Sequence, residues 1–266
     1  MKNSNFIQKY EQVLNVKQYS PSTIKNYSCQ VEIFLNHFKL KDSPKHISSD
    51  EIEKYLLTAK CINSQRHAHS ALKLFYKLTV HQPMKFRFIP YAKKEKKLPV
   101  VIDSNHILES LSKIENLKHK TLLSLAFSVG LRVSEIVNLK IEDIDSKRMI
   151  IHIKNAKGRK DRIVPLSEKI LALLRTYYKS YKPTEFLFNG QFKNQYSVRS
   201  CQEIFKIYID KSGHFHQLRH SCFTNLLENG TDLRMIQKIA GHSSTKTTEI
   251  YTHVSQASLN RVNLPI

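Results

Sequence analysis

Hydrophobic positions in the first part of the chain recur with the spacing of helices. Between residues 24 and 38 they stand mostly three or four positions apart, which places them along one face of a helix. Ser48 and Glu51 have the spacing of a capping box and precede a second hydrophobic stripe. A third stripe runs over residues 64–78, with cations on the opposite face. Residues 1–82 are therefore predicted to form a small helical bundle.

The pattern changes over residues 83–99, where three prolines stand among six lysine and arginine residues. Proline and repulsion between like charges both favour an extended chain. We interpret this segment as a basic linker that joins two domains. Its length would suffice either for an ordinary tether or for a segment that passes around a large bound partner.

From residue 100 onward, helical stripes surround a single hairpin pattern. Isoleucine-rich alternation over residues 149–154 and its return over 161–166 predict two strands joined by a basic turn. Further helices are predicted at about 104–114, 118–129, 167–177, 197–210, 216–229, 232–240 and 245–254. We therefore expect a second domain over residues 100–266, and a chain that is mainly α-helical with a small β-sheet.

The net charge of the chain indicates what kind of partner it binds. The 266 residues include 43 Lys and Arg against 22 Asp and Glu, a formal net charge of +21. Lysine and arginine are in excess both before and after Leu98, so no single tail explains the imbalance. The alternatives are a protein that is merely basic and one that binds an anionic membrane, for which no amphipathic anchor stands out. A polyanion contacted by both halves, such as double-stranded DNA, explains the charge best.

The sequence lacks the patterns of a secreted or membrane protein. No apolar run approaches the roughly 20 residues that span a bilayer, and the first residues have no secretory signal pattern. The four cysteines form no Cys-x-x-Cys pair, so neither a disulfide framework nor a zinc ribbon is expected. We expect a cytoplasmic, nucleoid-associated protein.

Candidate chemistry is concentrated in the last quarter of the chain. Arg219 carries a flat, permanently charged fork that fits two phosphate oxygens. His216 and His242 can donate hydrogen bonds or move protons near neutral pH. Tyr251 has a hydroxyl that becomes a nucleophile once its proton is removed. Because the cluster lacks paired carboxylates for magnesium, protein cations would carry the charge in any phosphoryl chemistry.

Three other interpretations of this region stay open. His216 and His220 share a helix face as metal ligands can, although the glutamate of a His-Glu-x-x-His motif is missing. Residues 232–254 could form a helix-turn-helix, although Lys246 is the only cation on its last helix. Tyr251 could be an ordinary core tyrosine.

The order of the motifs decides between these interpretations. They are Gly130-Leu-Arg132-Val-Ser-Glu135, the Lys157-Gly158 turn, His216-x-x-Arg219-His220, Gly241-His242-Ser-Ser and Tyr251-Thr-His253. This set resembles the tyrosine recombinase (phage integrase, Xer-type) family over the whole chain. The resemblance implies a SAM-like, core-binding helical domain and a catalytic domain that together form a C-shaped clamp on DNA. Phe223 departs from the small residue usual in the family, which we expect to affect packing rather than chemistry.

The resemblance also implies a mechanism. Tyr251 would attack a scissile phosphodiester, form a 3′-phosphotyrosyl bond and release a 5′-hydroxyl. Arg132 and Arg219 would hold the non-bridging oxygens, and His242 would donate a further hydrogen bond to them. Because one ester replaces another, neither ATP nor any other cofactor is expected, and no metal.

The remaining roles concern protons and assembly. Lys157 would protonate the leaving oxygen, with Lys154 and Lys160 nearby as less suitable matches, and His216 would accept or hold the tyrosine proton. The family works as a homo- or hetero-tetramer on DNA, and we expect the tail, residues 255–266, to dock into a neighbouring protomer. Glu135 would position Arg132.

The implied function is site-specific recombination through a Holliday junction. Two alternatives keep the same fold: a non-catalytic DNA-binding regulator, and a type IB topoisomerase-like enzyme that relaxes DNA without exchanging partners.

Overall fold

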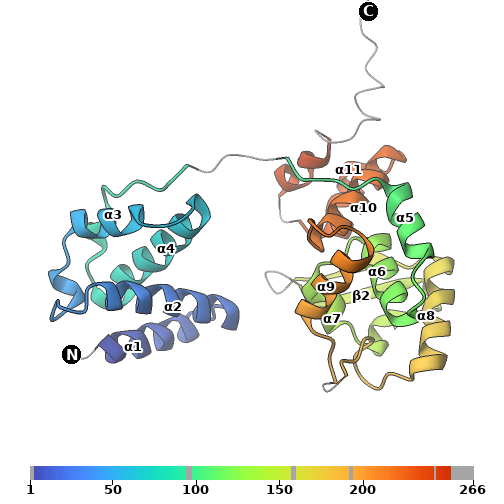
Figure 1. Cartoon of the computed structure of the whole chain (residues 1–266), viewed down its shortest axis with the longest axis horizontal. Coiled ribbons are helices and arrows are strands. Elements are labelled where there is room, and N and C mark those ends of the chain that lie inside the picture. The colour runs from blue at the N-terminus through green and yellow to red at the C-terminus, as the bar shows by residue number, and fades with distance from the viewer. Residues whose placement is uncertain (1–2, 94–97, 157–159, 192–193, 243, 253–266) are drawn as a thin grey trace, which may run out of the picture. The chain divides into compact units, whose positions relative to one another are not determined.

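The computed structural model describes residues 3–93, 98–156, 160–191, 194–242 and 244–252. The chain divides into two compact units, Met1–Lys96 and Lys97–Ile266, which are described separately below (Figure 1). Helices predominate in both units, and the strands form one small sheet. None of the helices in the described ranges combines the length and hydrophobicity that crossing a bilayer requires.

Unit 1 is a bundle of four helices. They are α1 (Asn3–Val16), α2 (Pro21–His37), α3 (Ser49–Leu57) and α4 (Ile62–Phe75). The predicted capping box is present, because the Ser48 hydroxyl accepts from the Glu51 N–H and the Glu51 carboxylate accepts from the Ser48 N–H. The core is rich in aromatic side chains, including Tyr10, Phe34 and Phe75, which are fully buried.

The end of this bundle differs from the expected linker. After α4 the chain makes a π-helical turn over Tyr76–Val80 and a 3₁₀ turn over Pro83–Phe86. Phe86 and Ile89 are buried in the core of unit 1, so the first part of residues 83–99 is folded rather than extended. The prediction was wrong there because it relied on the basic residues and prolines. The two apolar side chains among them are stabilised by burial in the core.

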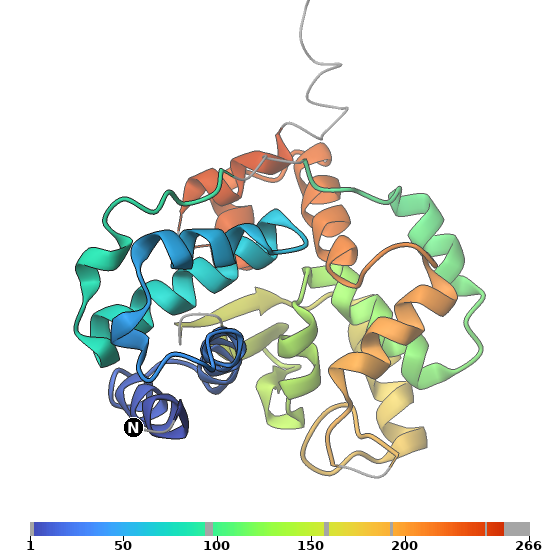
Figure 2. The same cartoon turned by 60° about the vertical axis from the view of Figure 1, so that its left-hand side comes forward.

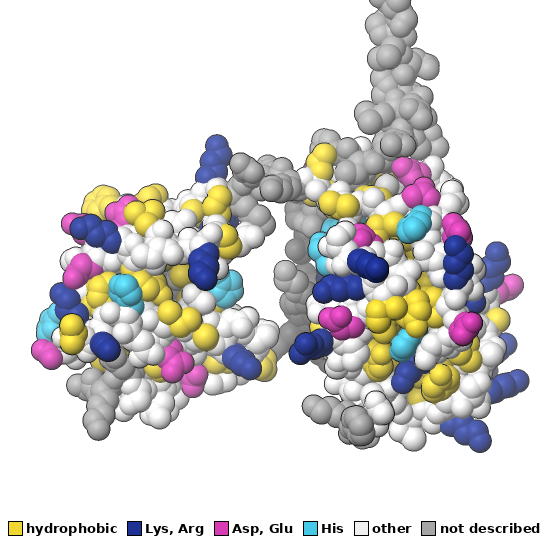
Figure 3. All heavy atoms as spheres, viewed as in Figure 1, with side chains coloured by type: hydrophobic (Ala, Val, Ile, Leu, Met, Phe, Trp, Pro, Cys, Tyr) yellow, Lys and Arg dark blue, Asp and Glu magenta, His cyan; other side chains and the backbone are white. Residues whose placement is uncertain are grey.

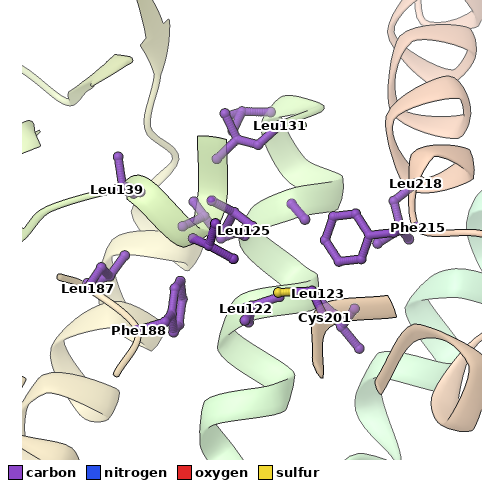
Figure 4. Packing of buried hydrophobic residues seen from close by; sticks show 14 of the residues in the cluster. Leu122, Leu123, Leu125, Leu131, Leu139, Leu187, Phe188, Cys201, Phe215 and Leu218 are labelled. Atoms are coloured by element: carbon purple, nitrogen blue, oxygen red, sulfur yellow. The ribbon is translucent and has the colours of Figure 1, made fainter. Parts of the chain in front are cut away.

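Unit 2 combines helices with a three-stranded antiparallel sheet (Figure 2). The strands are β1 (Ile144–Asp145), β2 (Ile150–Ala156) and β3 (Lys160–Pro165), in the order β1-β2-β3. The helices are α5 (Ser104–Ser112), α6 (Leu117–Val129), α7 (Val133–Asn138), α8 (Glu168–Tyr181), α9 (Val198–Tyr208), α10 (His216–Glu228) and α11 (Leu233–Ala240). Leucines of α6 pack against side chains of α9 and α10 at the centre of the core (Figure 4).

The segment after α11 is not the full helix predicted over 245–254. Two 3₁₀ turns, Thr245–Thr247 and Glu249–Tyr251, take its place in the described residues. Threonine is a weak helix former, and the buried Thr248 side chain bonds to His242 instead of lying on a regular helix face. Residues 253–266, which include the predicted tail, lie outside the described part of the chain.

Candidate active site

Arg219 lies at the centre of the predicted cluster. It stands on α10 and is only 1% exposed. Its guanidinium donates to the carbonyl oxygens of Gly130 and Ala240, which close the C-terminal ends of α6 and α11. Such carbonyls carry the negative end of the helix dipole and offset the cost of burying the charge. Burial, followed by the charge of Arg132, lowers the pKa of Arg219 to about 10, which leaves it protonated at neutral pH.

Arg132 precedes the first turn of α7 and pairs with Glu135. Its Nη1 lies 2.7 Å from the carboxylate, and its backbone N–H donates to the other carboxylate oxygen at 2.9 Å. The side chain remains 19% exposed, so the guanidinium is held in place and still reaches solvent. Glu135 therefore contacts Arg132 directly, as its predicted supporting role requires.

Glu135 has a second partner that the sequence analysis missed. Arg162, on β3, donates from Nη1 and Nη2 to the two carboxylate oxygens at 2.8 Å each. Burial alone would raise the pKa of Glu135, but its hydrogen bonds and charge interactions with Arg162, then Arg132, hold that pKa at about 2. The carboxylate stays ionised and links the two arginines.

Arg162 also connects this ion pair to the loop that carries His242. Its Nε donates to the carbonyl oxygen of Ile239 at 2.7 Å, and its Cδ lies 2.9 Å from where a Cβ on Gly241 would stand. The alternation of the predicted strand could have identified Arg162 as a buried charge. Strand alternation places Arg162 on the same face as the fully buried Val164, an unusual position for an unpaired charge.

His242 follows α11 and contacts two polar side chains. Its Nε2 lies 3.2 Å from Nη2 of Arg219, and its Nδ1 lies 2.9 Å from the hydroxyl of Thr248. A guanidinium has only donors, so Nε2 accepts and Nδ1 carries the hydrogen toward Thr248. Burial, then the charge of Arg219, lowers the pKa of His242 to about 4, so the ring is neutral at pH 7.

Tyr251 is buried in a cluster of rings and is 2% exposed. Its ring stacks with His242 at a centroid distance of 6.4 Å and meets Phe223 edge-on at 5.5 Å. Its hydroxyl lies 3.3 Å from Nδ1 of His220. Burial raises the pKa of Tyr251 to about 12, against a smaller opposing effect of Arg219. Attack by this oxygen at neutral pH therefore requires a proton acceptor.

His216 stands one helical turn before His220, and the two rings lie edge to face at 4.6 Å. Burial, followed by the charge of His220, lowers the pKa of His216 to about 4. His216 is more exposed to solvent than His220 and His242. The hydroxyl of Tyr251 bonds to His220, whereas His216 lies beyond that ring.

The predicted lysine, Lys157, lies outside the described residues. One of its neighbours in the same turn pattern is placed, however. Lys154 pairs with Glu142 at 3.0 Å and Asp143 at 2.7 Å, and these carboxylates raise its pKa. An ammonium held in this way is a weak proton donor, which favours the other lysines of the hairpin for that role.

Phe223 packs against two residues of the site, Arg219 and Tyr251. The guanidinium of Arg219 lies over its ring, 4.7 Å from the centroid, a cation–π contact. The same ring packs against Gly130, where a Cβ would approach it to 2.6 Å. Sequence reasoning could not find this contact because it joins α6, α10 and the turn of Tyr251 across the core.

Unit 1 carries a separate basic surface. A cavity of about 540 Å³ lies beside α4, where Lys73, Lys77 and Arg87 stand next to three tyrosines. Arg66, on the same helix, stacks over Tyr91 at 4.1 Å. Cations interleaved with aromatic rings are typical of nucleic-acid contacts. Figure 3 shows lysine and arginine side chains spread over the visible faces of both units.

Comparison with known proteins places this geometry in a family. Residues 101–258 match the phage integrase family, and residues 6–85 match the phage integrase N-terminal SAM-like domain. The chain belongs to the phage integrase family, the tyrosine recombinases. The resemblance drawn from the motifs is thereby confirmed, as is the predicted fold class of a helical SAM-like domain and a catalytic domain with a small sheet. Members of this family are DNA strand-exchanging enzymes.

Individual relatives agree with this assignment. A putative integrase/recombinase of Sinorhizobium fredii is 33% identical over 260 residues, which cover 93% of this chain and 84% of the relative. Tyrosine recombinase XerA of Pyrococcus horikoshii is 31% identical, with 97% and 92% covered. A crystal structure of XerA recombinase matches 99% of this chain and 100% of its own with a TM-score of 0.57 at 28% identity.

Proposed function

We propose that this tyrosine recombinase cuts and rejoins DNA at specific sites through a 3′-phosphotyrosyl intermediate on Tyr251 and a Holliday junction. The observation that carries the proposal is the convergence of the phenol, Arg219 and His242. The ring of Tyr251 stacks on His242, which itself bonds to Arg219. The proposed nucleophile and the two proposed phosphate-binding groups thus lie in one cluster, although they come from three separate segments.

The arginines have the chemistry to stabilise the transition state. Charge gathers on the non-bridging oxygens of the phosphate during displacement, and preorganised donors lower its energy without reorganising. Within the described residues, Arg219 uses three of its five N–H donors, two on helix-end carbonyls and one on Nε2 of His242, which leaves two for a phosphate. Arg132, held by Glu135 and partly exposed, supplies the second fork.

His242 would donate to the phosphate after a change of tautomer. An anionic oxygen beside Nε2 favours the form that carries hydrogen there, and Nδ1 then accepts from the hydroxyl of Thr248. Thr248 can play either part, because a hydroxyl both donates and accepts. The buried threonine therefore keeps the ring oriented in both forms.

The remaining parts of the proposal rest on the family resemblance. Lys157 would protonate the leaving 5′ oxygen, and the resemblance assigns His216 to accept or hold the proton of Tyr251. The proposed partner is double-stranded DNA with a specific recombination site, contacted by both units. A lambda integrase tetramer bound to a Holliday junction shares the fold, with a TM-score of 0.73 at 18% identity over 93% of this chain and 76% of the integrase. We propose a tetramer on DNA that is joined through residues 255–266, in the nucleoid of the cytoplasm.

The test begins with the DNA itself. Covalent complexes trapped in cells by a denaturant, and then sequenced, would identify the target site. A nicked duplex of that sequence should form a covalent protein–DNA band with the native chain. Tyr251→Phe should abolish the band while binding survives, and Tyr178→Phe, an exposed tyrosine on α8, should leave it intact.

The outcomes separate the alternatives. Binding without any covalent band from the native chain would indicate a DNA-binding regulator. A covalent band with relaxation of supercoiled DNA, but no joining to a second duplex, would indicate a topoisomerase-like enzyme. Products joined between two duplexes support the recombinase.

A further inference from the structure

The hydroxyl of Tyr251 has a specific partner in the protein, and that partner is not the histidine expected from the motif. Nδ1 of His220 lies 3.3 Å from the phenolic oxygen, and the two rings are tilted at a centroid distance of 5.8 Å. His220 stands on α10 one residue after Arg219, so the same helix presents the phosphate-binding fork and the partner of the nucleophile.

His220 has the state that a proton acceptor needs. The ring is half-buried, and burial, followed by the charge of Arg219, lowers its pKa to about 4, which keeps it neutral at pH 7. A neutral imidazole with an acceptor Nδ1 carries its hydrogen on Nε2. His216 packs edge to face against this ring at 4.6 Å and so fixes its orientation.

From this geometry we propose that His220 accepts the proton of Tyr251 during strand cleavage and returns it during ligation. The inference rests on the proposed function and assigns a catalytic residue to the same site. His216 then acts on the phosphate side and as packing for His220, rather than as the acceptor.

The proton balance of the cleavage step is closed. The proton of the Tyr251 hydroxyl moves to Nδ1 of His220 as the phenolic oxygen forms its bond to phosphorus. The bond between phosphorus and the 5′ oxygen breaks, and that oxygen takes a proton from the general acid proposed above, Lys157. In ligation the 5′-hydroxyl attacks phosphorus and returns its proton to the lysine, while the departing Tyr251 oxygen takes the proton back from His220.

The test compares two leaving groups. Ligation from the native phosphotyrosyl bond requires a proton for Tyr251, because a tyrosine oxygen leaves poorly as an anion. A DNA end that carries a 3′-p-nitrophenyl phosphate requires none, since p-nitrophenol departs readily as its anion. The second substrate is used with Tyr251→Phe protein, so that the 5′-hydroxyl attacks it directly.

The proposal predicts a selective defect. His220→Ala should slow cleavage of the nicked duplex, and ligation from the phosphotyrosyl complex, by about 10²-fold or more. The same substitution in the Tyr251→Phe background should leave ligation of the p-nitrophenyl end unchanged. His220→Gln should retain binding and assembly and show the same selectivity. His106→Ala, an exposed histidine on α5, serves as the control and should match the native chain.

Each other outcome overturns the inference. If His220→Ala slows the reactions of both substrates equally, His220 has a structural role. If it slows neither, His220 has no role in the reaction. A selective defect in His216→Ala instead would return the role to that residue. The proposed function fails separately, if the native chain forms no covalent complex at all.

Discussion

Arg162 and Glu135 form a bidentate ion pair inside unit 2, with both guanidinium Nη atoms 2.8 Å from the carboxylate oxygens. The side chains are only 7% and 4% exposed. The pair joins the β2–β3 hairpin to the first turn of α7, and through Ile239 to the loop of His242. The position of Arg132 and that of the His242 loop are thus coupled through one carboxylate.

This pair should be costly to break from one side. Arg162→Ala leaves a buried carboxylate with one partner, so we expect a loss of about 3–5 kcal/mol in the free energy of unfolding. Arg162→Lys keeps the charge but loses the fork, and should lie between native and alanine variants. Thermal unfolding measures both, with Arg175→Ala, an exposed arginine on α8, as the control. A melting temperature unchanged by Arg162→Ala would contradict the coupling.

Acidification should destabilise unit 2 in two steps. The pKa of His220 and His242 is lowered from 6.5 to about 4, so between these values the unfolded chain binds protons that the folded chain does not. Stability therefore falls as the pH falls through this window. The pKa of Glu135 is lowered from 4.5 to about 2, so its contribution is present above 4.5 and is lost as the pH falls toward 2.

Melting temperatures measured across these windows test the signs. The double variant His220→Gln and His242→Gln should show a flatter dependence on pH in the upper window, while the lower window keeps its slope. Stability that rises on acidification from neutral pH would contradict the direction of both histidine shifts.

Much of this architecture follows from local patterns. The capping box at Ser48 and the helix predicted over residues 118–129 depend on neighbouring residues, so the sequence predicted them correctly. The buried Phe86 and the partners of Arg162 depend on contacts between distant segments, which spacing along the chain does not reveal. The motif identified Arg219, but only the structure shows that helix-end carbonyls hold its charge.

Substitutions at Gly130 and Phe223 should have strongly non-additive effects on the free energy of unfolding. Gly130 has φ +62° and a Cβ there would meet the Phe223 ring at 2.6 Å, so Gly130→Ala adds a clash to a backbone cost of about 1 kcal/mol. Phe223→Ala alone should cost about 3–5 kcal/mol by leaving a cavity. The double variant should be less destabilised than the sum, because alanine at 223 removes the clash.

Gly230 offers a matched control for that cycle. It has φ +83°, but no atom of the described residues lies within 4 Å of the added Cβ, so Gly230→Ala measures the backbone cost alone. Equal losses for Gly130→Ala and Gly230→Ala would contradict the close contact with Phe223. Denaturant unfolding followed by circular dichroism supplies the values.

The basic cavity of unit 1 should contribute to the salt dependence of DNA binding. Lys73 and Lys77 line it and are exposed, so each can neutralise one phosphate. Releasing one counterion per contact gives a slope of about 0.9 in log affinity against log salt, so the double alanine variant should lose about 1.8 of the slope. Titrations of a labelled duplex at several salt concentrations measure it.

Lys9→Ala, an exposed lysine on α1 away from the cavity, is the control for charge alone. If Lys9→Ala lowers the slope by half as much as the double variant, which is the same loss per charge, the lysines act through net charge, because any cation on the surface then serves as well. A loss of slope confined to the cavity lysines would instead place phosphates at α4. Contacts to the DNA phosphates carry no sequence information, so the loss of slope should be the same for target and unrelated duplexes.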